Sequence, residues 1–266
     1  IYREIKSQDI KSQDIKSQDI IRQDNDTIEI KCVNHFENVC QEVSYEKGIY
    51  GVLPIENTTE GIVNQVYDLL VKHNLYVVDE LQLTVSNCLI SSADSLDEIK
   101  TIISHPQALA QCKNLIRELN VTTLDSPSTS QAVTECVGNK EYAAIANESC
   151  AEIYGMNLLL QNINDEETNQ TKFVLVSDRP HISEHTKDFM LAFTLEHQPG
   201  ALSATLQLFS DYGLSMNNLV SRPVPGRPFE YRFYVTIAGD INNNKVKALL
   251  LQLKQELISV VYLGNL

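Results

Sequence analysis

The sequence predicts an α/β protein of two domains, the second with a ferredoxin-like βαββαβ order. Over residues 27–178, short apolar runs typical of strands alternate with segments of helical periodicity, a pattern that favours largely parallel sheets. Residues 188–266 follow the order strand, helix, strand, strand, helix, strand. The polar segment 179–187 contains Pro180 and lacks periodicity, so we expect it to link the two domains.

In the first domain, apolar spacing separates strands from helices. The clearest helix is 57–74, where apolar side chains recur at helical spacing along one face. Pro106 suits the first turn of another helix, and Gly155 suits a helix C-terminus. Strands are expected at 27–33, 51–55, 76–83, 101–104, 121–124, 142–146 and 171–177, with helices at 35–43, 57–74, 106–119, 128–137 and just before 155.

In the second domain, the expected strands are 189–196, 214–220, 231–238 and 259–263, and the expected helices are 199–212 and 245–257. Before both domains, residues 5–19 read IKSQD three times. A five-residue period would place successive isoleucines about 140° apart on a helix and on alternating faces of a strand. Neither element buries them together, so residues 1–26 are expected to form a poorly ordered leader.

Composition restricts the classes of partner. The chain of 266 residues is 43% hydrophobic, which suffices for two modest cores, and its net charge is −14. Nucleic acid is therefore not expected as a partner, since no basic patch with interleaved aromatics offsets that charge. The six cysteines form no CxxC pair and are expected to be reduced, packed thiols. Without a signal sequence or a membrane-length apolar run, the expected compartment is the cytoplasm.

Three junctions between a strand and a helix carry polar side chains, at residues 56–60, 104–107 and 126–130. Unpaired N–H groups make helix N-termini suitable for anions. Each junction also has a purely structural interpretation: Asn57 with Glu60 as a capping box, Pro106 as a helix start, Ser128 as a cap. Taken together, they favour a site for a small anion.

Single side chains leave two interpretations open. Glu56 directly follows an apolar run, so a structural hydrogen bond and a substrate contact are equally compatible with it. Gln107 and Gln111 share a helix face and either point toward the site or are solvated. His181 and His185 have metal-compatible spacing, but two histidines in a linker are usually solvated.

Four motifs resemble those of the prephenate dehydratases. Residues 51–61 read GVLPIENTTEG, 104–107 read SHPQ, 128–130 read STS, and 169–173 read NQTKF, similar to the family's N-x-T-R-F signature. The resemblance implies a two-lobed dehydratase domain like the periplasmic binding proteins. After the linker, Pro199-Gly-Ala-Leu202 and Ser221-Arg-Pro223 resemble the ligand loops of an ACT regulatory domain.

The resemblance implies a decarboxylative dehydration that converts prephenate into phenylpyruvate, in phenylalanine biosynthesis and without a metal or organic cofactor. Thr171 would be the catalytic residue, placing its hydroxyl at the departing ring oxygen. Residues matching the family's substrate contacts are Glu56, Asn57, Ser104, Gln111, Ser128, Thr129, Lys172 and Phe173.

The resemblance also implies feedback regulation by phenylalanine. The ACT domain would form dimers or tetramers and bind phenylalanine between subunits. Gly200 would allow close approach of the backbone to the ligand, or would only begin a helix. The residues matching the regulatory site are Gly200, Ala201, Leu202, Ser221, Arg222 and Pro223.

Three positions depart from the family. Its first strand and its Gly-Thr-Phe/Tyr-Ser motif are not found, and the IKSQD repeat takes their place. Lys172 replaces an arginine and cannot form the planar bidentate contact with a carboxylate. Val220 replaces a glutamate. Two alternatives therefore accompany the dehydratase: a degenerate homologue that binds phenylalanine or prephenate without turnover, and an arogenate dehydratase.

Overall fold

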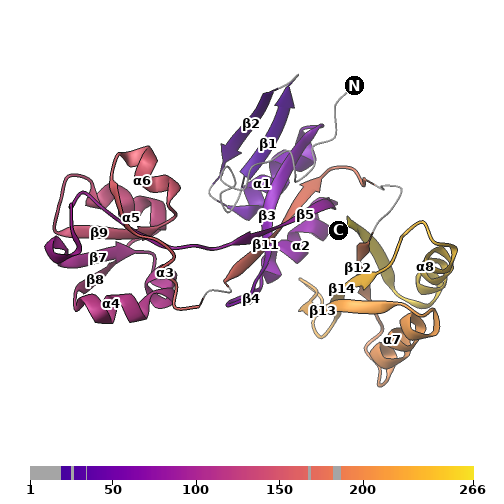
Figure 1. The fold of residues 1–266 in the computed structure, drawn as a ribbon. Helices are drawn as coiled ribbons and strands as arrows, with labels where there is room; N and C mark the ends of the chain where they lie inside the picture. Colours follow the sequence, from indigo (N-terminus) through magenta and orange to yellow (C-terminus); the bar gives the residue numbers. More distant parts are fainter. Residues whose placement is uncertain (1–18, 25–26, 34, 167–168, 182–186) are drawn as a thin grey trace. The chain divides into compact units, whose positions relative to one another are not determined.

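The computed structural model describes residues 19–24, 27–33, 35–166, 169–181 and 187–266 (Figure 1). These residues form two compact units. The first combines the chain up to Gln82 with Lys172–Leu266, and the second is Leu83–Thr171. Residues 182–186 of the predicted linker, including His185, lie outside the described residues.

A sheet of ten strands organises the first unit, in the order β13-β14-β12-β15-β5-β11-β3-β1-β2 with β4 paired to β3. Its first part contains α1 (Phe36–Tyr45) and α2 (Asn64–His73), which pack against β3. The strands of this part are β1 (Asp19–Asp24), β2 (Thr27–Cys32), β3 (Ile49–Asn57), β4 (Gly61–Ile62), β5 (Tyr76–Thr84) and β11 (Gln170–Ser177).

The end of the expected leader is a strand. β1 pairs antiparallel with β3, with Ile20 opposite Gly51, and also with β2. Ile20 and Ile21 are fully buried. The prediction of a poorly ordered leader is therefore wrong for residues 19–24, because β-ladder pairing and burial of two β-branched side chains outweigh the weak local pattern. Residues 1–18, with most of the repeat, lie outside the described part.

Helix α2 begins seven residues later than the sequence predicts. The Asn57 side-chain oxygen accepts hydrogen bonds from the backbone N–H groups of Thr59 and Glu60, at 2.9 and 3.0 Å. These bonds close a turn rather than cap a helix. After the turn, β4 pairs Ile62 with Glu56, and α2 follows at Asn64. Only the Asn57 half of the predicted capping box is thus found among the described residues, and it turns the chain between two strands.

The second unit contains a sheet in the order β10-β6-β9-β7-β8, in which β7 lies parallel to both β8 and β9. The strands are β6 (Cys88–Ser91), β7 (Thr101–Ser104), β8 (Thr122–Asp125), β9 (Tyr142–Ala146) and β10 (Asn157–Leu160). The helices are η3 (Leu96–Glu98), α3 (Pro106–Gln111), α4 (Lys113–Leu119), α5 (Thr129–Cys136) and α6 (Ser149–Tyr154).

The helix predicted over 106–119 is interrupted at Cys112, whose φ of −128° and ψ of 31° are not helical. Asp165 explains the interruption. Its carboxylate accepts hydrogen bonds from the backbone N–H groups of Lys113 and Asn114, at 2.9 and 3.0 Å. A carboxylate 52 residues away in sequence therefore caps a new helix N-terminus.

The βαββαβ order predicted for the C-terminal domain is confirmed. One sheet face packs on α7 and α8. The other face contributes Met190, Val220 and Tyr234 to the core that also contains Tyr67 and Leu70. The elements are β12 (Asp188–Thr194), α7 (Ala201–Asp211), β13 (Ser215–Pro223), β14 (Tyr231–Ala238), α8 (Asn244–Glu256) and β15 (Ser259–Asn265).

β15 joins this domain to the rest of the sheet by pairing with β5 at Gly264 and Val77. Gly264 has a φ of 120°, and a Cβ atom at this position would collide with the Val77 backbone. Glycine is required here for both conformation and contact. The edge of the C-terminal sheet can thus approach β5 closely.

The five cysteines with described side chains are free and buried, as the sequence predicts. Burial raises the pKa of the thiols of Cys40, Cys112 and Cys136 to about 12. They therefore stay protonated and unreactive at neutral pH. In the described part of the chain, no helix has the length and hydropathy needed to cross a membrane.

Replacing Ile20 with alanine tests whether β1 contributes to the core. Because the side chain is fully buried, Ile20→Ala should lower the free energy of unfolding by about 2–4 kcal/mol, measured by urea denaturation. Ile153→Ala is the matched control, because Ile153 is 64% exposed and its loss should cost less than about 0.5 kcal/mol. Equal effects of the two variants would contradict the burial of β1.

Candidate functional site

A cavity of about 150 Å³ in the first unit brings together two of the predicted substrate contacts. Glu56 reaches it from the end of β3, and Lys172 reaches it from β11. Tyr67 on α2 completes the polar wall on this side. The full lining is Ile55, Glu56, Tyr67, Lys172, Val174, Asp188, Met190, Asn217, Asn218, Thr236 and Leu266.

Glu56 is half-buried, and its carboxylate lies near the Tyr67 hydroxyl. The pKa of Tyr67 is raised far above its usual value, first by burial and then by the charge of Glu56. Tyr67 therefore remains protonated at all physiological pH values. No hydrogen bond to the Glu56 carboxylate is found among the described residues, so this group is available to a ligand in the cavity.

Lys172 is positioned between the cavity and β5. Its Nζ lies 3.5 Å from Oε2 of Glu80, too far for a good hydrogen bond, and its side chain is 37% exposed. Glu80 Oε2 is itself shielded from solvent and accepts no hydrogen bond from the described residues. An arginine, with its planar fork of donors, could both reach Glu80 and face the cavity.

Thr171, the predicted catalytic residue, is half-buried on β11 at the point where the second unit ends and the first resumes. Side chains alternate along a strand, so Thr171 and Lys172 point to opposite faces of the sheet. The next residue, Phe173, is buried, with 8% exposure. A packing role therefore suffices to explain Phe173.

In the second unit, two of the predicted junctions lie side by side. The Ser126 backbone N–H donates to the Ser104 carbonyl at 2.8 Å, so the ends of the parallel strands β7 and β8 meet at one sheet edge. The hydroxyl of Ser104 is fully buried and donates to the Ile145 carbonyl at 2.6 Å. That bond stabilises the strand end and occupies the hydroxyl proton.

The helix starts beside these strands are capped by their own residues. Ser128 Oγ accepts from the Gln131 N–H at 3.1 Å, as predicted, and Thr129 begins α5 half-buried. The His105 ring accepts from the Gln107 N–H at 3.3 Å and caps α3. Two of the three predicted anion-binding helix starts thus use a side-chain cap.

Gln111 does not form a solvated pair with Gln107. Its side-chain oxygen accepts a hydrogen bond from the Asn87 side chain at 3.2 Å, and its backbone carbonyl accepts one from Asp165 at 2.7 Å. Gln111 is therefore fixed at the end of α3. Its amide N–H₂ group makes no further hydrogen bond within the described residues.

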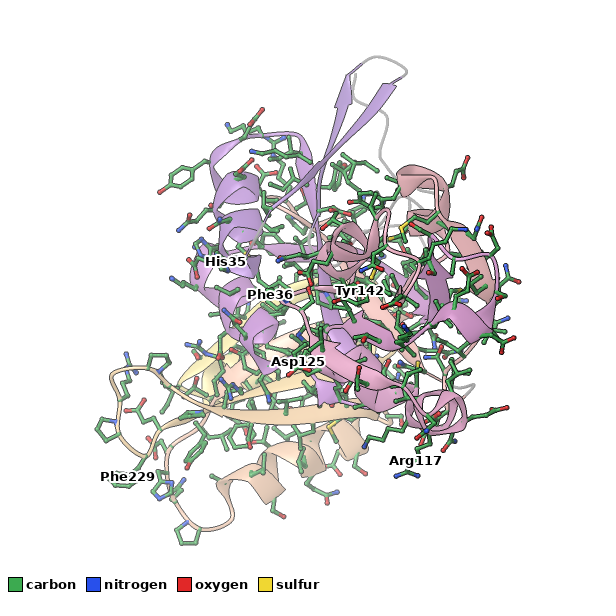
Figure 2. All side chains as sticks on the ribbon, turned by 90° about the vertical axis from the view of Figure 1, so that its left-hand side faces the viewer. His35, Phe36, Arg117, Asp125, Tyr142 and Phe229 are labelled. Atoms are coloured by element: carbon green, nitrogen blue, oxygen red, sulfur yellow. The ribbon has the colours of Figure 1, made fainter. Side chains whose placement is uncertain are left out.

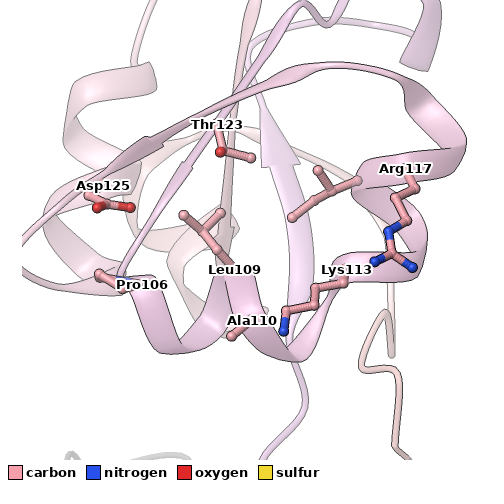
Figure 3. Close-up of a pocket in the computed structure, with 8 residues that line it drawn as sticks. Pro106, Leu109, Ala110, Lys113, Arg117, Thr123 and Asp125 are labelled. Atoms are coloured by element: carbon pink, nitrogen blue, oxygen red, sulfur yellow. The ribbon is translucent and has the colours of Figure 1, made fainter.

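The second unit also contains a larger cavity, of about 350 Å³, between α3, α4 and β8 (Figure 3). Lys113 and Arg117 extend from α4, and Asp125 lies on β8. None of the residues predicted to bind substrate lines this cavity. Cavity size alone therefore does not identify the site that the sequence motifs indicate.

In the C-terminal domain, Gly200 directly precedes α7 with a φ of 83°, and a Cβ atom there would meet nothing within 4 Å. The backbone conformation, not close packing, therefore requires glycine. Ala201 and Leu202 line a cavity of about 130 Å³ together with Phe233 and other residues. The remaining lining residues are Leu195, Glu196, His197, Gln198, Phe229 and Tyr231.

The other predicted regulatory segment, residues 221–223 on β13, pairs with β14, and Tyr231 and Phe233 of β14 line this cavity. Ser221 is the register partner of Phe233, and Pro223 is the partner of Tyr231. Ser221 and Pro223 are exposed, whereas Arg222 between them is half-buried and bonds Asp68 on α2. Tyr67 and Asp68 could not be predicted from the sequence, because adjacent polar positions on an amphipathic helix give no signal of a distant partner.

The residues that the structure describes contain no group of three or more His, Cys, Asp or Glu side chains positioned to hold a metal ion. The polar chemistry of the 150 Å³ cavity consists of carboxylates, an ammonium, amides and hydroxyls. Such a set can bind an anionic or zwitterionic organic molecule.

Replacing Lys172 with arginine should stabilise the protein. The longer planar group can donate to Oε2 of Glu80, which accepts no hydrogen bond from the described residues, and this should raise the free energy of unfolding by about 0.5–1 kcal/mol in urea denaturation. Lys31→Arg is the control, because Lys31 already donates to both oxygens of Glu42 at 2.8 and 2.9 Å. A loss of stability in Lys172→Arg alone would refute this assignment.

Comparisons with known proteins agree with these motifs. Residues 16–181 match the family model for prephenate dehydratase. A bifunctional chorismate mutase/prephenate dehydratase of Aquifex aeolicus is 29% identical over 230 residues, covering 86% of this chain and 64% of that protein. An arogenate dehydratase/prephenate dehydratase of Arabidopsis thaliana is 32% identical over 216 residues, covering 74% of this chain and 57% of that protein.

The crystal structure of prephenate dehydratase from Arthrobacter aurescens in complex with L-Phe superposes with a TM-score of 0.79 at 26% identity, covering 88% of this chain and 79% of that one. This chain spans 64% and 57% of the two curated relatives above. The family match extends over more than half of the chain and contains all four dehydratase motifs. The chain therefore belongs to the prephenate dehydratase family.

Proposed function

We propose that this chain converts prephenate into phenylpyruvate, with residues 27–178 as the catalytic domain and 188–266 as an ACT regulatory domain joined by 179–187. The observation that carries the proposal is the family match over residues 16–181. It includes β1, which pairs with β3 where the family's first strand was expected to be missing. In the sheet that bears Glu56 and Lys172, the edge of β3 is thus paired with β1 at residues 49–52.

The reaction requires positioning more than strong acid or base chemistry. The bond between the ring and its carboxylate breaks and its electron pair enters the ring, while the ring C–O bond breaks and its electron pair leaves with the oxygen. The departing hydroxide takes one proton from the solvent and is released as water. Carbon dioxide and aromatic phenylpyruvate result. Thr171 is too weak an acid to protonate a free alcohol, so it acts as a hydrogen-bond donor to the departing oxygen as negative charge develops.

The remaining predicted contacts would hold the substrate's carboxylates and carbonyl. Lys172 is the one cation among the residues that line the 150 Å³ cavity, so it is the partner proposed for a carboxylate. Asn57, Ser104, Ser128 and Thr129 would contribute mainly by shaping the site, since each already has a hydrogen bond within the fold or begins a helix.

Arogenate is the second candidate substrate, because of Glu56. Arogenate carries an ammonium group where prephenate has a keto group. The half-buried Glu56 carboxylate, which accepts no hydrogen bond from the part of the chain that the structure describes, is a suitable partner for that ammonium. The similarity to a plant protein named for both activities supports testing the two substrates together.

Thr171 variants separate catalysis from folding. Thr171→Val keeps the branched shape but removes the hydroxyl, and should lower kcat by about 100- to 1000-fold, the effect of losing one hydrogen bond to a developing oxyanion. Thr171→Ser keeps a hydroxyl and should retain most activity. Phenylpyruvate or phenylalanine release from prephenate and arogenate gives kcat and KM for each. Full activity of Thr171→Val would exclude the proposed role.

We propose that phenylalanine binds at the C-terminal cavity beside Gly200 and reduces turnover. Its aromatic lining matches a phenyl ring, and Glu196 offers a carboxylate for the ammonium group. The β13–β14 hairpin exposes three large apolar side chains, those of Leu219, Phe229 and Tyr231. Such side chains suit contact with a second copy of the chain, so a homodimer or homotetramer is proposed. Phe229 lies in the β13–β14 connection (Figure 2). The proposed compartment is the cytoplasm.

Filling this cavity tests the effector site. Ala201→Leu places a larger side chain in the cavity and should abolish the rise in melting temperature that phenylalanine gives to the wild type. Ala204→Leu, at an exposed position of the same helix, is the control and should keep that rise. Retained stabilisation by phenylalanine in Ala201→Leu would place the effector elsewhere.

A further inference from the structure

The strand β13 has two functional faces. Asn218, Val220 and Arg222 turn inward, and Val220 is 7% exposed within the core shared with α2. Ser221 and Pro223 face outward. Alternation along the strand thus connects the proposed effector side with the dehydratase domain within a single element.

Asp68 on α2 receives three hydrogen bonds from the C-terminal domain. Arg222 donates to Oδ2 through Nη2 at 2.9 Å and through Nε at 3.2 Å. The Tyr234 hydroxyl donates to Oδ1 at 3.0 Å. Both side chains of the ion pair are only about a third exposed, 31% for Arg222 and 30% for Asp68. Both carboxylate oxygens of Asp68 are therefore used to fix β13 and β14 on α2.

The neighbouring residue Tyr67 continues this contact toward the substrate cavity. Its ring packs edge-to-face on Tyr234, with centroids 5.2 Å apart, and its hydroxyl accepts a hydrogen bond from Asn218 at 3.2 Å. Tyr67, Asn218 and Glu56 all line the same cavity. A shift of β13 would therefore change the wall opposite Glu56.

Helix α2 is also tied to Glu56 through the backbone. Glu56 pairs with Ile62 in the β3–β4 ladder, and the Val63 N–H donates to the Ile55 carbonyl at 2.9 Å. Two residues after Ile62 the helix begins. A displacement of α2 by its contact with Arg222 would thus be transmitted to Glu56 through a short, hydrogen-bonded connection.

We propose that Asp68 is a positioning residue that couples the two domains: through Arg222 and Tyr234 it transmits effector occupancy on the outer side of β13 to substrate affinity at Glu56. The proposal rests on the proposed function for the identity of both ligands. In this proposal, Arg222 binds Asp68 of the dehydratase domain rather than the effector. Ser221 and Pro223 remain on the effector side.

The coupling can be measured without turnover. The affinity of the product phenylpyruvate is determined by calorimetry with and without saturating phenylalanine, and the ratio of the two dissociation constants is the coupling factor. The wild type should show a ratio of about ten, within the usual range for allosteric coupling. Asp68→Asn should reduce this ratio to nearly one while leaving kcat without phenylalanine essentially unchanged.

Two further variants separate coupling from stability. Glu230→Gln breaks an ion pair of the same kind, Arg227 to Glu230 at 3.2 Å, within the β13–β14 connection, and should keep the wild-type ratio. Tyr234→Phe removes one hydrogen bond to Asp68 but retains the ring, and should lower the ratio partially. It provides the test if Asp68→Asn does not fold.

An unchanged ratio in Asp68→Asn or Tyr234→Phe would overturn the proposal, as would a wild-type ratio of one. Failure of the proposed function is a separate result, because it would appear as absent turnover of prephenate and arogenate. The phenylpyruvate ratio can still be measured in a chain that binds phenylpyruvate without turnover, and a chain that does not bind phenylpyruvate would overturn the proposal.

Discussion

The placement of β11 between β3 and β5 is the constraint on which the rest of the structure depends. The chain leaves the first sheet after β5, builds the whole second unit, and returns as β11 to hydrogen-bond with both strands. Only this return brings Lys172 next to Glu80 and into one cavity with Glu56. Thr171, directly before Lys172, is thereby fixed at the end of the second unit. The position of the proposed catalytic residue is thus a consequence of strand order.

The same sheet extends to the C-terminal domain. Gly264 allows β15 to approach β5, and the inward face of β13 rests on α2. The two domains therefore share a hydrophobic core. They also share a polar contact, in which both carboxylate oxygens of Asp68 accept hydrogen bonds. If the C-terminal domain regulates the dehydratase domain as proposed, no large movement is needed, because a small shift of β13 would change the cavity that Glu56 lines.

Local patterns predicted most strands and helices, the Ser128 cap, the buried cysteines and the βαββαβ domain, because periodicity and capping act over a few residues. They missed β1, β4, β6 and β10 and the antiparallel pairing of these strands. They failed where a residue that is distant in the sequence determines the local structure. Ile20 joins the sheet through β3, and Asp165 interrupts the predicted helix at Cys112. At the site, motif order indicated Glu56 and Lys172. It could not reveal that the Ser104 hydroxyl is occupied by Ile145, or that Arg222 faces Asp68.

The most direct test of the central claim is the stoichiometry of products from the purified chain and prephenate. Carbon dioxide and phenylpyruvate should appear in equal amounts, at a rate proportional to the protein concentration. This result would establish decarboxylative dehydration by a chain whose first described strand is β1. A folded chain that is stabilised by phenylalanine but releases neither product would contradict the claim and identify a binding protein derived from the dehydratases.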